Sequence, residues 1–168
     1  MKDEIINRVA NSKLKVIDLE DYYPEGKRIL FDIKDWLFEG FVLREKEFRA
    51  SVKNHDWSQY KDNFVALTCS TEAIIPAWAF MLLSIELQSY AKHVIIGSLN
   101  ELETSIYQNI IQNIDINQYQ NLPVIIKGCS NKPVPENAYL MLSNKLKPVA
   151  KSIMYGEACS AVPLYKKK

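Results

Sequence analysis

The sequence has little cysteine, glycine or histidine. Its 168 residues include three cysteines, five glycines and two histidines. No two cysteines are spaced as Cys-x-x-Cys, so the common paired zinc pattern is absent, and an odd number of thiols argues against a disulfide framework. Gly97 and Gly128 stand alone, which excludes a Walker loop or a dinucleotide fingerprint, and no Gly-x-Ser-x-Gly elbow occurs.

An excess of charge and a long apolar run are also missing. The net charge is +1, so no overall field attracts nucleic acid or an anionic membrane. The only basic run, Lys166–Lys168, is interpreted as a solvated end. The longest apolar stretch, Ile74–Ile85, is shorter than the roughly 20 residues of a membrane span and is typical of a core helix. We therefore expect neither nucleic acid nor membrane as a partner.

The first residues carry no apolar signal-peptide core, which predicts a cytoplasmic protein with reduced thiols. The length, with 48% hydrophobic and 24% charged residues, predicts one globular domain over 1–168. We divide it into an N-terminal addition (1–42), a core (43–156) and a tail (157–168). No repeat with a period of 20 to 50 residues is found.

The core alternates between strand-like and helix-like patterns. Short branched runs predict strands at Phe64–Cys69, His93–Ile96 and Val124–Cys129. Spaced apolar residues predict helices at Leu43–His55, Pro76–Tyr90, Ser98–Ile114 and Tyr139–Ile153, the last kinked or broken at Pro148. This alternation predicts an α/β fold, a three-layer sandwich around a mostly parallel sheet with three parallel strands in flavodoxin-like order.

The two ends of the chain are expected to be additions to this sheet. A short helix is predicted over residues 1–11, and strands at Leu14–Leu19 and Ile29–Ile33. Between these strands, Tyr22–Gly26 contains the proline and glycine of a turn, which favours an antiparallel hairpin-like pair. The tail after Gly156 is predicted to be irregular.

The predicted helix Pro76–Tyr90 is apolar almost all round. Such a helix needs cover on two sides, and the sheet supplies only one. A subunit interface is one candidate for the second cover, so we expect a homodimer.

Each of the three cysteines is followed by a serine, in Cys69-Ser70, Cys129-Ser130 and Cys159-Ser160. Cys69 and Cys129 end predicted strands, and parallel strands place their carboxyl ends at one edge of a sheet, where ligand sites are common. Both would precede helix N-termini, which favour thiolate. Cys159 lies in the tail and could join them, which predicts a site of three thiols.

Other ligands or bases are weighed beside these thiols. Glu72 and Glu157 each lie within three residues of a cysteine. His55 is a further candidate, although its predicted place and that of His93 are at the opposite edge of the sheet. Each of these residues also has a plain interpretation: a packed thiol, a carboxylate at a helix start or in a loop, or an imidazole that braces a loop. Thiolates bind zinc, copper(I) or iron–sulfur clusters, and the pattern does not identify the metal.

Four segments, 54–57, 66–70, 127–130 and 152–163, resemble those of an uncharacterised bacterial family known only as a domain of unknown function. The resemblance extends over nearly the whole chain. Genes of that family tend to lie beside SUF-type iron–sulfur assembly genes. The resemblance therefore implies a role in building or delivering iron–sulfur clusters, with iron–sulfur assembly proteins as partners.

Three hypotheses of function remain open. The first is an accessory protein of iron–sulfur assembly or a related thiol protein, with zinc, iron or an iron–sulfur cluster held by Cys69, Cys129 and Cys159. The second is a non-catalytic dimeric interaction or adaptor protein whose cysteines are buried and structural. The third is an enzyme with Cys69 or Cys129 as its nucleophile.

Overall fold

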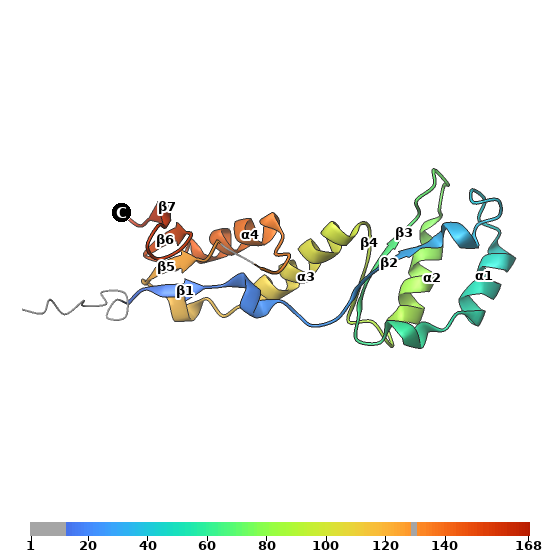
Figure 1. Cartoon of the computed structure of the whole chain (residues 1–168), viewed down its shortest axis with the longest axis horizontal. Helices are drawn as coiled ribbons and strands as arrows, with labels where there is room; N and C mark the ends of the chain where they lie inside the picture. Colours follow the sequence, from blue (N-terminus) through green and yellow to red (C-terminus); the bar gives the residue numbers. More distant parts are fainter. Residues whose placement is uncertain (1–12, 129–130) are drawn as a thin grey trace, which may run out of the picture. The chain divides into compact units, whose positions relative to one another are not determined.

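The computed structural model describes residues 13–128 and 131–168 (Figure 1). Contacts divide the chain into two compact units. Unit 1 comprises the described residues up to Tyr23 together with Tyr107–Lys168, and unit 2 comprises Pro24–Ile106. The single-domain organisation expected from the sequence stays a prediction.

Unit 2 contains a parallel sheet of three strands in the order β2-β3-β4. Its elements are β2 (Arg28–Asp32), the 3₁₀ helix η2 (Ile33–Trp36), α1 (Glu45–Asn54), the 3₁₀ helix η3 (Trp57–Tyr60), β3 (Phe64–Thr68), α2 (Ala77–Leu87) and β4 (His93–Ile96). Side chains of α1, α2 and the strands form one buried cluster. The central strand β3 is buried over four of its five residues: strands pair with it on both edges, and Val65 and Leu67 pack in this cluster.

Unit 1 contains a sheet of four strands in the order β1-β5-β6-β7. Its elements are β1 (Lys15–Ile17), the 3₁₀ helix η1 (Leu19–Tyr22), the C-terminal part of α3 (Leu99–Asn113), the 3₁₀ helix η4 (Asn117–Tyr119), β5 (Pro123–Ile126), α4 (Glu136–Leu146), β6 (Ser152–Tyr155) and β7 (Val162–Lys166). The first three strands are parallel, and β7 is antiparallel to β6.

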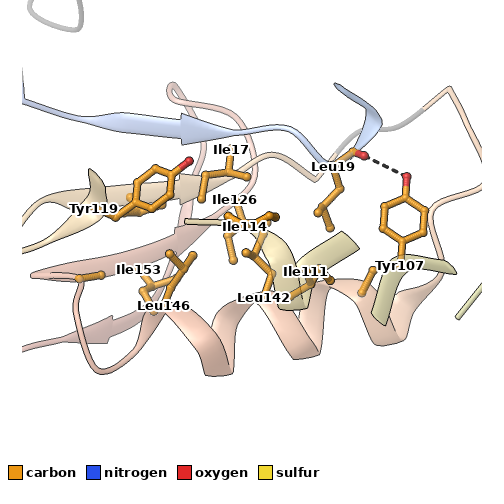
Figure 2. Packing of buried hydrophobic residues seen from close by; sticks show 13 residues of the cluster. Ile17, Leu19, Tyr107, Ile111, Ile114, Tyr119, Ile126, Leu142, Leu146 and Ile153 are labelled. Atoms are coloured by element: carbon orange, nitrogen blue, oxygen red, sulfur yellow. Dashed lines mark hydrogen bonds between the residues drawn. The ribbon is translucent and has the colours of Figure 1, made fainter. Parts of the chain in front are cut away.

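The core of unit 1 joins segments that are far apart in sequence (Figure 2). Ile17 and Leu19 lie beside side chains of α3 and α4, which include Tyr107 and Leu142. The buried hydroxyl of Tyr107 donates to the carbonyl oxygen of Leu19 at 2.9 Å (Figure 2). This bond satisfies the one polar atom of a fully buried ring, so burying it carries little penalty.

The two units are two copies of one arrangement. Helix α2 begins at Ala77 and α4 begins at Glu136, 59 positions later, and both have eleven residues. The same offset relates β3, which begins at Phe64, to β5, which begins at Pro123. In both units an early strand pairs in parallel with the central strand in the same register, as Phe31 with Leu67 and as Ile17 with Ile126.

The buried residues of the outer helices also repeat. In α2 they are Ala79, Leu83 and Leu87, and in α4 they are Ala138, Leu142 and Leu146, in each case at the same positions. The period of 59 residues is longer than the range of 20 to 50 in which the sequence shows no repeat. We conclude that the chain contains an internal duplication.

The prediction of one three-stranded sheet is wrong, although the α/β class is confirmed. Strands β3 and β4 pair with each other, whereas β5 belongs to the other sheet. The flavodoxin-like order and the three-layer sandwich are not confirmed. The physical reason is that the order of strands along a chain does not fix which edges meet. One edge of β3 pairs with β2, and one edge of β5 pairs with β1, so β3 and β5 do not belong to the same sheet.

The predicted N-terminal hairpin is also wrong, because β1 and β2 do not pair with each other but join different sheets. The turn signal at Tyr22–Gly26 instead marks the passage from unit 1 to unit 2. Asp18 follows β1 directly and Asp32 is the last residue of β2, and each side chain accepts from a backbone N–H and caps a 3₁₀ helix. The chain therefore turns away after each strand.

The C-terminal prediction fails at Pro148. Helix α4 ends at Leu146, and Ser152–Tyr155 is a strand, because proline cannot continue the helical hydrogen bonds. The tail predicted to be irregular contains β7. The predicted helix over residues 1–11 lies outside the described residues. The remaining predicted helices and strands are confirmed in type, with ends that shift by a few residues.

The duplication predicts equal roles for Leu83 and Leu142, which are both 0% exposed. We expect Leu83→Ala and Leu142→Ala each to lower the free energy of unfolding by about 2–5 kcal/mol, because each leaves a cavity in a core. Urea denaturation would measure the change. The control is Leu140→Ala, at a site 61% exposed, which should cost no more than about 0.5 kcal/mol. Equal effects of all three variants would contradict this assignment of the cores.

Candidate functional site

The described cysteines belong to different units. Cys69 follows β3 in unit 2 and is partly buried, whereas Cys159 lies in the loop between β6 and β7 of unit 1 and is exposed. Cys129 lies outside the described residues. Over residues 13–128 and 131–168, no group of three or more His, Cys, Asp or Glu side chains is arranged to hold a metal ion. A shared site of three thiols therefore stays a prediction.

Cys69 is held by a chain of hydrogen bonds. Its Sγ lies 3.3 Å from Oγ1 of Thr71, and this hydroxyl donates to the carbonyl oxygen of Gly40 at 2.8 Å. A hydroxyl has one hydrogen, so the thiol is the donor in the Cys69–Thr71 contact. Helix α2 begins only at Ala77, so Cys69 is not in its first turn, and the expected effect of a helix N-terminus on this thiol is wrong.

The loop that carries Cys69 is tied to the end of β2. Asp32 accepts hydrogen bonds from the backbone N–H groups of Ser70 and Lys34, each at 3.1 Å. Burial favours a higher pKa for Asp32, but the hydrogen bonds from Ser70 and Lys34 outweigh it and lower the pKa. The carboxylate is thus a structural acceptor at the carboxyl edge of the sheet. Glu72, two residues beyond Ser70, is exposed.

The equivalent edge of unit 1 is lined by paired charges. Nζ of Lys127 lies 2.7 Å from Oδ2 of Asp18. Burial tends to raise the pKa of Asp18, but the Lys127 hydrogen bond and further contacts lower it. A carboxylate oxygen of Glu20 accepts from the backbone N–H groups of Asn131 and Lys132. These contacts hold the chain at Asn131 and Lys132.

Glu157 joins this charged edge. The Asp18 hydrogen bond raises the pKa of Lys127, and the carboxylate of Glu157 adds to that effect. Cys159 follows two residues later and is exposed. The carboxylate of Glu157 therefore lies near the exposed thiol in sequence, and Lys127 follows β5 at the edge where β5 and β6 end side by side.

His55 lies in an aromatic cluster of unit 2. Its ring centroid is 5.5 Å from that of Phe31, 5.2 Å from Trp36, 4.7 Å from Trp57 and 5.7 Å from Tyr60. Its Nε2 lies 2.9 Å from the hydroxyl of Tyr60. Burial lowers the pKa of His55, and it also raises that of Tyr60 to about 12. These contacts support the interpretation of His55 as an imidazole that braces the loop.

The neighbours of His55 are structural as well. Asp56 caps η3 by accepting from the backbone N–H of Ser58 at 3.0 Å. The indole N–H of Trp57 donates to the carbonyl oxygen of Val52 at 3.0 Å, near the end of α1. The residues of segment 54–57 therefore form and stabilise the turn between α1 and η3. The other histidine, His93, has its Nε2 2.7 Å from Oγ of Ser105 in α3, and burial lowers its pKa.

The main unexplained feature of unit 2 is an apolar groove between α2 and β4, which we call the α2–β4 surface. It has a volume of about 420 Å³ and is lined by Leu67, Phe80, Met81, Ser84, Ile85, Val94, Ile95 and Ile96. Met81, Ile85 and Ile96 are each more than 60% exposed (64%, 63% and 62%). The sequence indicated the second apolar face of this helix but not the participation of the strand.

The duplication shows that this exposure is not required by the fold. The outer helix of unit 1, α4, buries the same three positions, yet its surface is more polar. Ala77 and Ile85 of α2 correspond to Glu136 and Asn144 of α4. Of these two positions, only that of Ile85 lines the groove, and the position of Met81 stays apolar, as Leu140. The groove therefore differs from the equivalent positions of unit 1 mainly by the apolar side chain of Ile85.

Fold and site define an α/β protein built from two copies of one unit. The chain belongs to the family described as Protein of unknown function (DUF2480), whose sequence model matches residues 3–167. This confirms the resemblance to a domain of unknown function, while the association with SUF-type genes stays a prediction. The comparisons with curated proteins and with solved structures find no match to the chain. No helix among the described residues is long and apolar enough to cross a membrane, and a cytoplasmic location stays a prediction.

The exposure of Cys159 predicts that it reacts faster than Cys69. In a Cys129→Ser background, we expect labelling of the native protein by a thiol reagent in two phases, a fast one from Cys159 and a slow one from the partly buried Cys69. Adding Cys159→Ser should remove the fast phase. A fast phase that survives this substitution would show that Cys69 is the reactive thiol.

The half-buried His55 predicts a loss of stability in weak acid. The folded state lowers the pKa of His55 below its ordinary 6.5, so the unfolded chain binds more protons below that pH. The free energy of unfolding should fall from about pH 7 to about pH 5. The counterpart of His55 in unit 1 is Ile114, so His55→Ile is a natural test. Chemical denaturation across this range should show a smaller fall in the variant, and an equal fall would contradict the assignment.

Proposed function

We propose that this protein acts by association and not by chemistry of its own, as a homodimeric interaction protein. The observation that carries the proposal is the α2–β4 surface, where Met81, Ile85 and Ile96 are exposed side by side along one groove. Contiguous exposed apolar surface is uncommon on monomers and marks interaction sites. Burying it against a second copy would supply the second cover that this helix needs.

The comparison of α2 with α4 supports a specific role for this surface. The two helices have the same buried positions, so the cores do not require different outer faces. The polar residues Glu136 and Asn144 show that the fold accepts polar side chains at these positions. Of the corresponding positions in α2, Ile85 lines the groove, and its exposed apolar side chain supports a contact that unit 2 makes and unit 1 does not.

Charged residues in the groove should separate the two copies. We expect Met81→Glu and Ile85→Glu each to raise the dissociation constant of the dimer by about tenfold or more, because each buries a carboxylate without a partner. Sedimentation velocity over a range of concentrations would measure it. The matched control is Leu140→Glu, at the position of α4 that corresponds to Met81 and with similar exposure (61%). A wild-type protein that stays monomeric throughout, or a control variant that dissociates equally, would refute the proposal.

A second candidate function is a thiol site in unit 1, which continues the metal or iron–sulfur hypothesis. The observation in its favour is the placement of Cys159, which is exposed in the loop that follows β6. Strands β5 and β6 are parallel neighbours, and Cys129 follows β5 in sequence. A pair of thiols in unit 1 is therefore better supported than a group of three that includes Cys69 of unit 2.

Metal analysis of protein purified without oxygen distinguishes these possibilities. If unit 1 holds zinc, iron or an iron–sulfur cluster, Cys129→Ser and Cys159→Ser should lose it while Cys69→Ser retains it. Loss in all three variants would restore the three-thiol hypothesis. Wild-type protein without stoichiometric metal, after reconstitution with iron and sulfide, would remove this candidate.

A further inference from the structure

We infer that β4 is the centre of the dimer interface and pairs in antiparallel fashion with β4 of a second copy. The two three-stranded sheets of unit 2 would then form one continuous sheet of six strands. This inference rests on the proposed homodimer and deepens it, because it names the strand edge, and not only the apolar groove, as the contact.

The edges of the two described sheets differ in how they are protected. Sheet edges offer unpaired backbone groups, and proteins protect them with charged residues or proline. Three of the edge strands have such protection: β1 begins with Lys15, β2 begins with Arg28, and β7 contains Pro163. The fourth edge strand, β4, has the sequence His93-Val94-Ile95-Ile96 and contains no aspartate, glutamate, lysine, arginine or proline. This is the edge most suited to pairing with another strand.

The duplication indicates what covers this edge. The counterpart of β4 in unit 1 is β6, which begins 59 positions later. The outer edge of β6 is covered by the antiparallel strand β7, from Val162 opposite Tyr155 to Lys166 opposite Ser152. Among the described residues, the sheet of unit 2 contains three strands and no fourth. A strand from outside the unit would therefore complete the arrangement that β7 completes in unit 1.

A second copy of β4 fits this place. An antiparallel pair with its twofold axis at Ile95 sets Ile95 opposite Ile95 and Val94 opposite Ile96 of the other copy, so that opposed side chains point to the same face of the sheet. No like charges oppose each other, and branched side chains pair across the strands. The imidazole of His93 already bonds to Ser105. Because the axis is perpendicular to the sheet, both copies of α2 lie on the same face, where Met81 and Ile85 can pack together.

Hydrogen exchange measures this contact through the backbone. Amides of β4 that face outward should exchange at least about tenfold more slowly in the dimer than in protein diluted to the monomer. Amides of β2, at the other edge of the same sheet, serve as the internal control and should not change. A contact made only by the side chains of α2 would leave the outer amides of β4 open to solvent.

A substitution at the edge gives an independent measurement. We expect Ile96→Lys to raise the dissociation constant of the dimer by about tenfold or more, because it adds the protection that the other edges have. The matched control is Leu164→Lys on β7, at a site 55% exposed. Circular dichroism and thermal unfolding would verify that both variants fold.

The outcomes separate this inference from the proposed function. A dimer that dissociates with Ile85→Glu but shows unchanged exchange in β4 and tolerates Ile96→Lys would overturn the strand pairing and leave the homodimer in place. A protein that is monomeric at every concentration would overturn both. Slower exchange in β4 together with dissociation by Ile96→Lys, and not by Leu164→Lys, is the expected result.

Discussion

The pairing of an early strand with a distant central strand is the contact on which each unit depends. In unit 1, Lys15–Ile17 lies in register with Val124–Ile126, more than one hundred residues away along the chain. The buried Tyr107–Leu19 hydrogen bond and the Asp18–Lys127 ion pair both follow from it, since each joins the segment around β1 to the C-terminal half. Unit 2 uses the same parallel pairing between β2 and β3. Closing a loop of this length is costly in chain entropy, so the burial of the strands must offset it.

Comparison of the two copies separates what the fold needs from what varies. The positions that repeat are those that fill the cores, such as Leu83 and Leu142, or that cap short helices, such as Asp18 and Asp32. Outward positions differ. Around His55, unit 2 has a cluster of aromatic rings, whereas the counterpart of His55 in unit 1, Ile114, belongs to the buried cluster of that unit. The two copies therefore differ at one corner of the core as well as at the surface.

The duplication also shows which cysteine positions are equivalent in the two units. Cys69 follows β3 of unit 2 and Cys129 follows β5 of unit 1. They are 60 positions apart, one more than the offset of the repeat, so the position equivalent to Cys69 is Gly128 and not Cys129. Cys159 has no cysteine at the equivalent place in unit 2, and it is exposed. This makes Cys159 the more informative thiol for any chemistry of the protein.

The sequence by itself determined the local elements. The helix predicted from Ser98 begins with a capping box, in which the backbone N–H of Ser98 donates to Glu101 at 2.7 Å, and the apolar runs at β3, β4 and β5 are strands. These features depend on neighbours within a few residues, so periodicity and capping chemistry predict them. The second apolar face of α2 was predicted for the same reason, because its residues are contiguous in sequence.

Only the tertiary structure decided which strands meet. Strand pairing is a contact between distant segments, and β1, with three residues, has the same composition whichever partner it takes. The separation of Cys69 from Cys159 into different units, and the open edge of β4 beside the apolar groove, follow from that pairing. The sequence indicated which residues were candidates for a site, and the partition of the strands into two sheets decided which of them belong to the same unit.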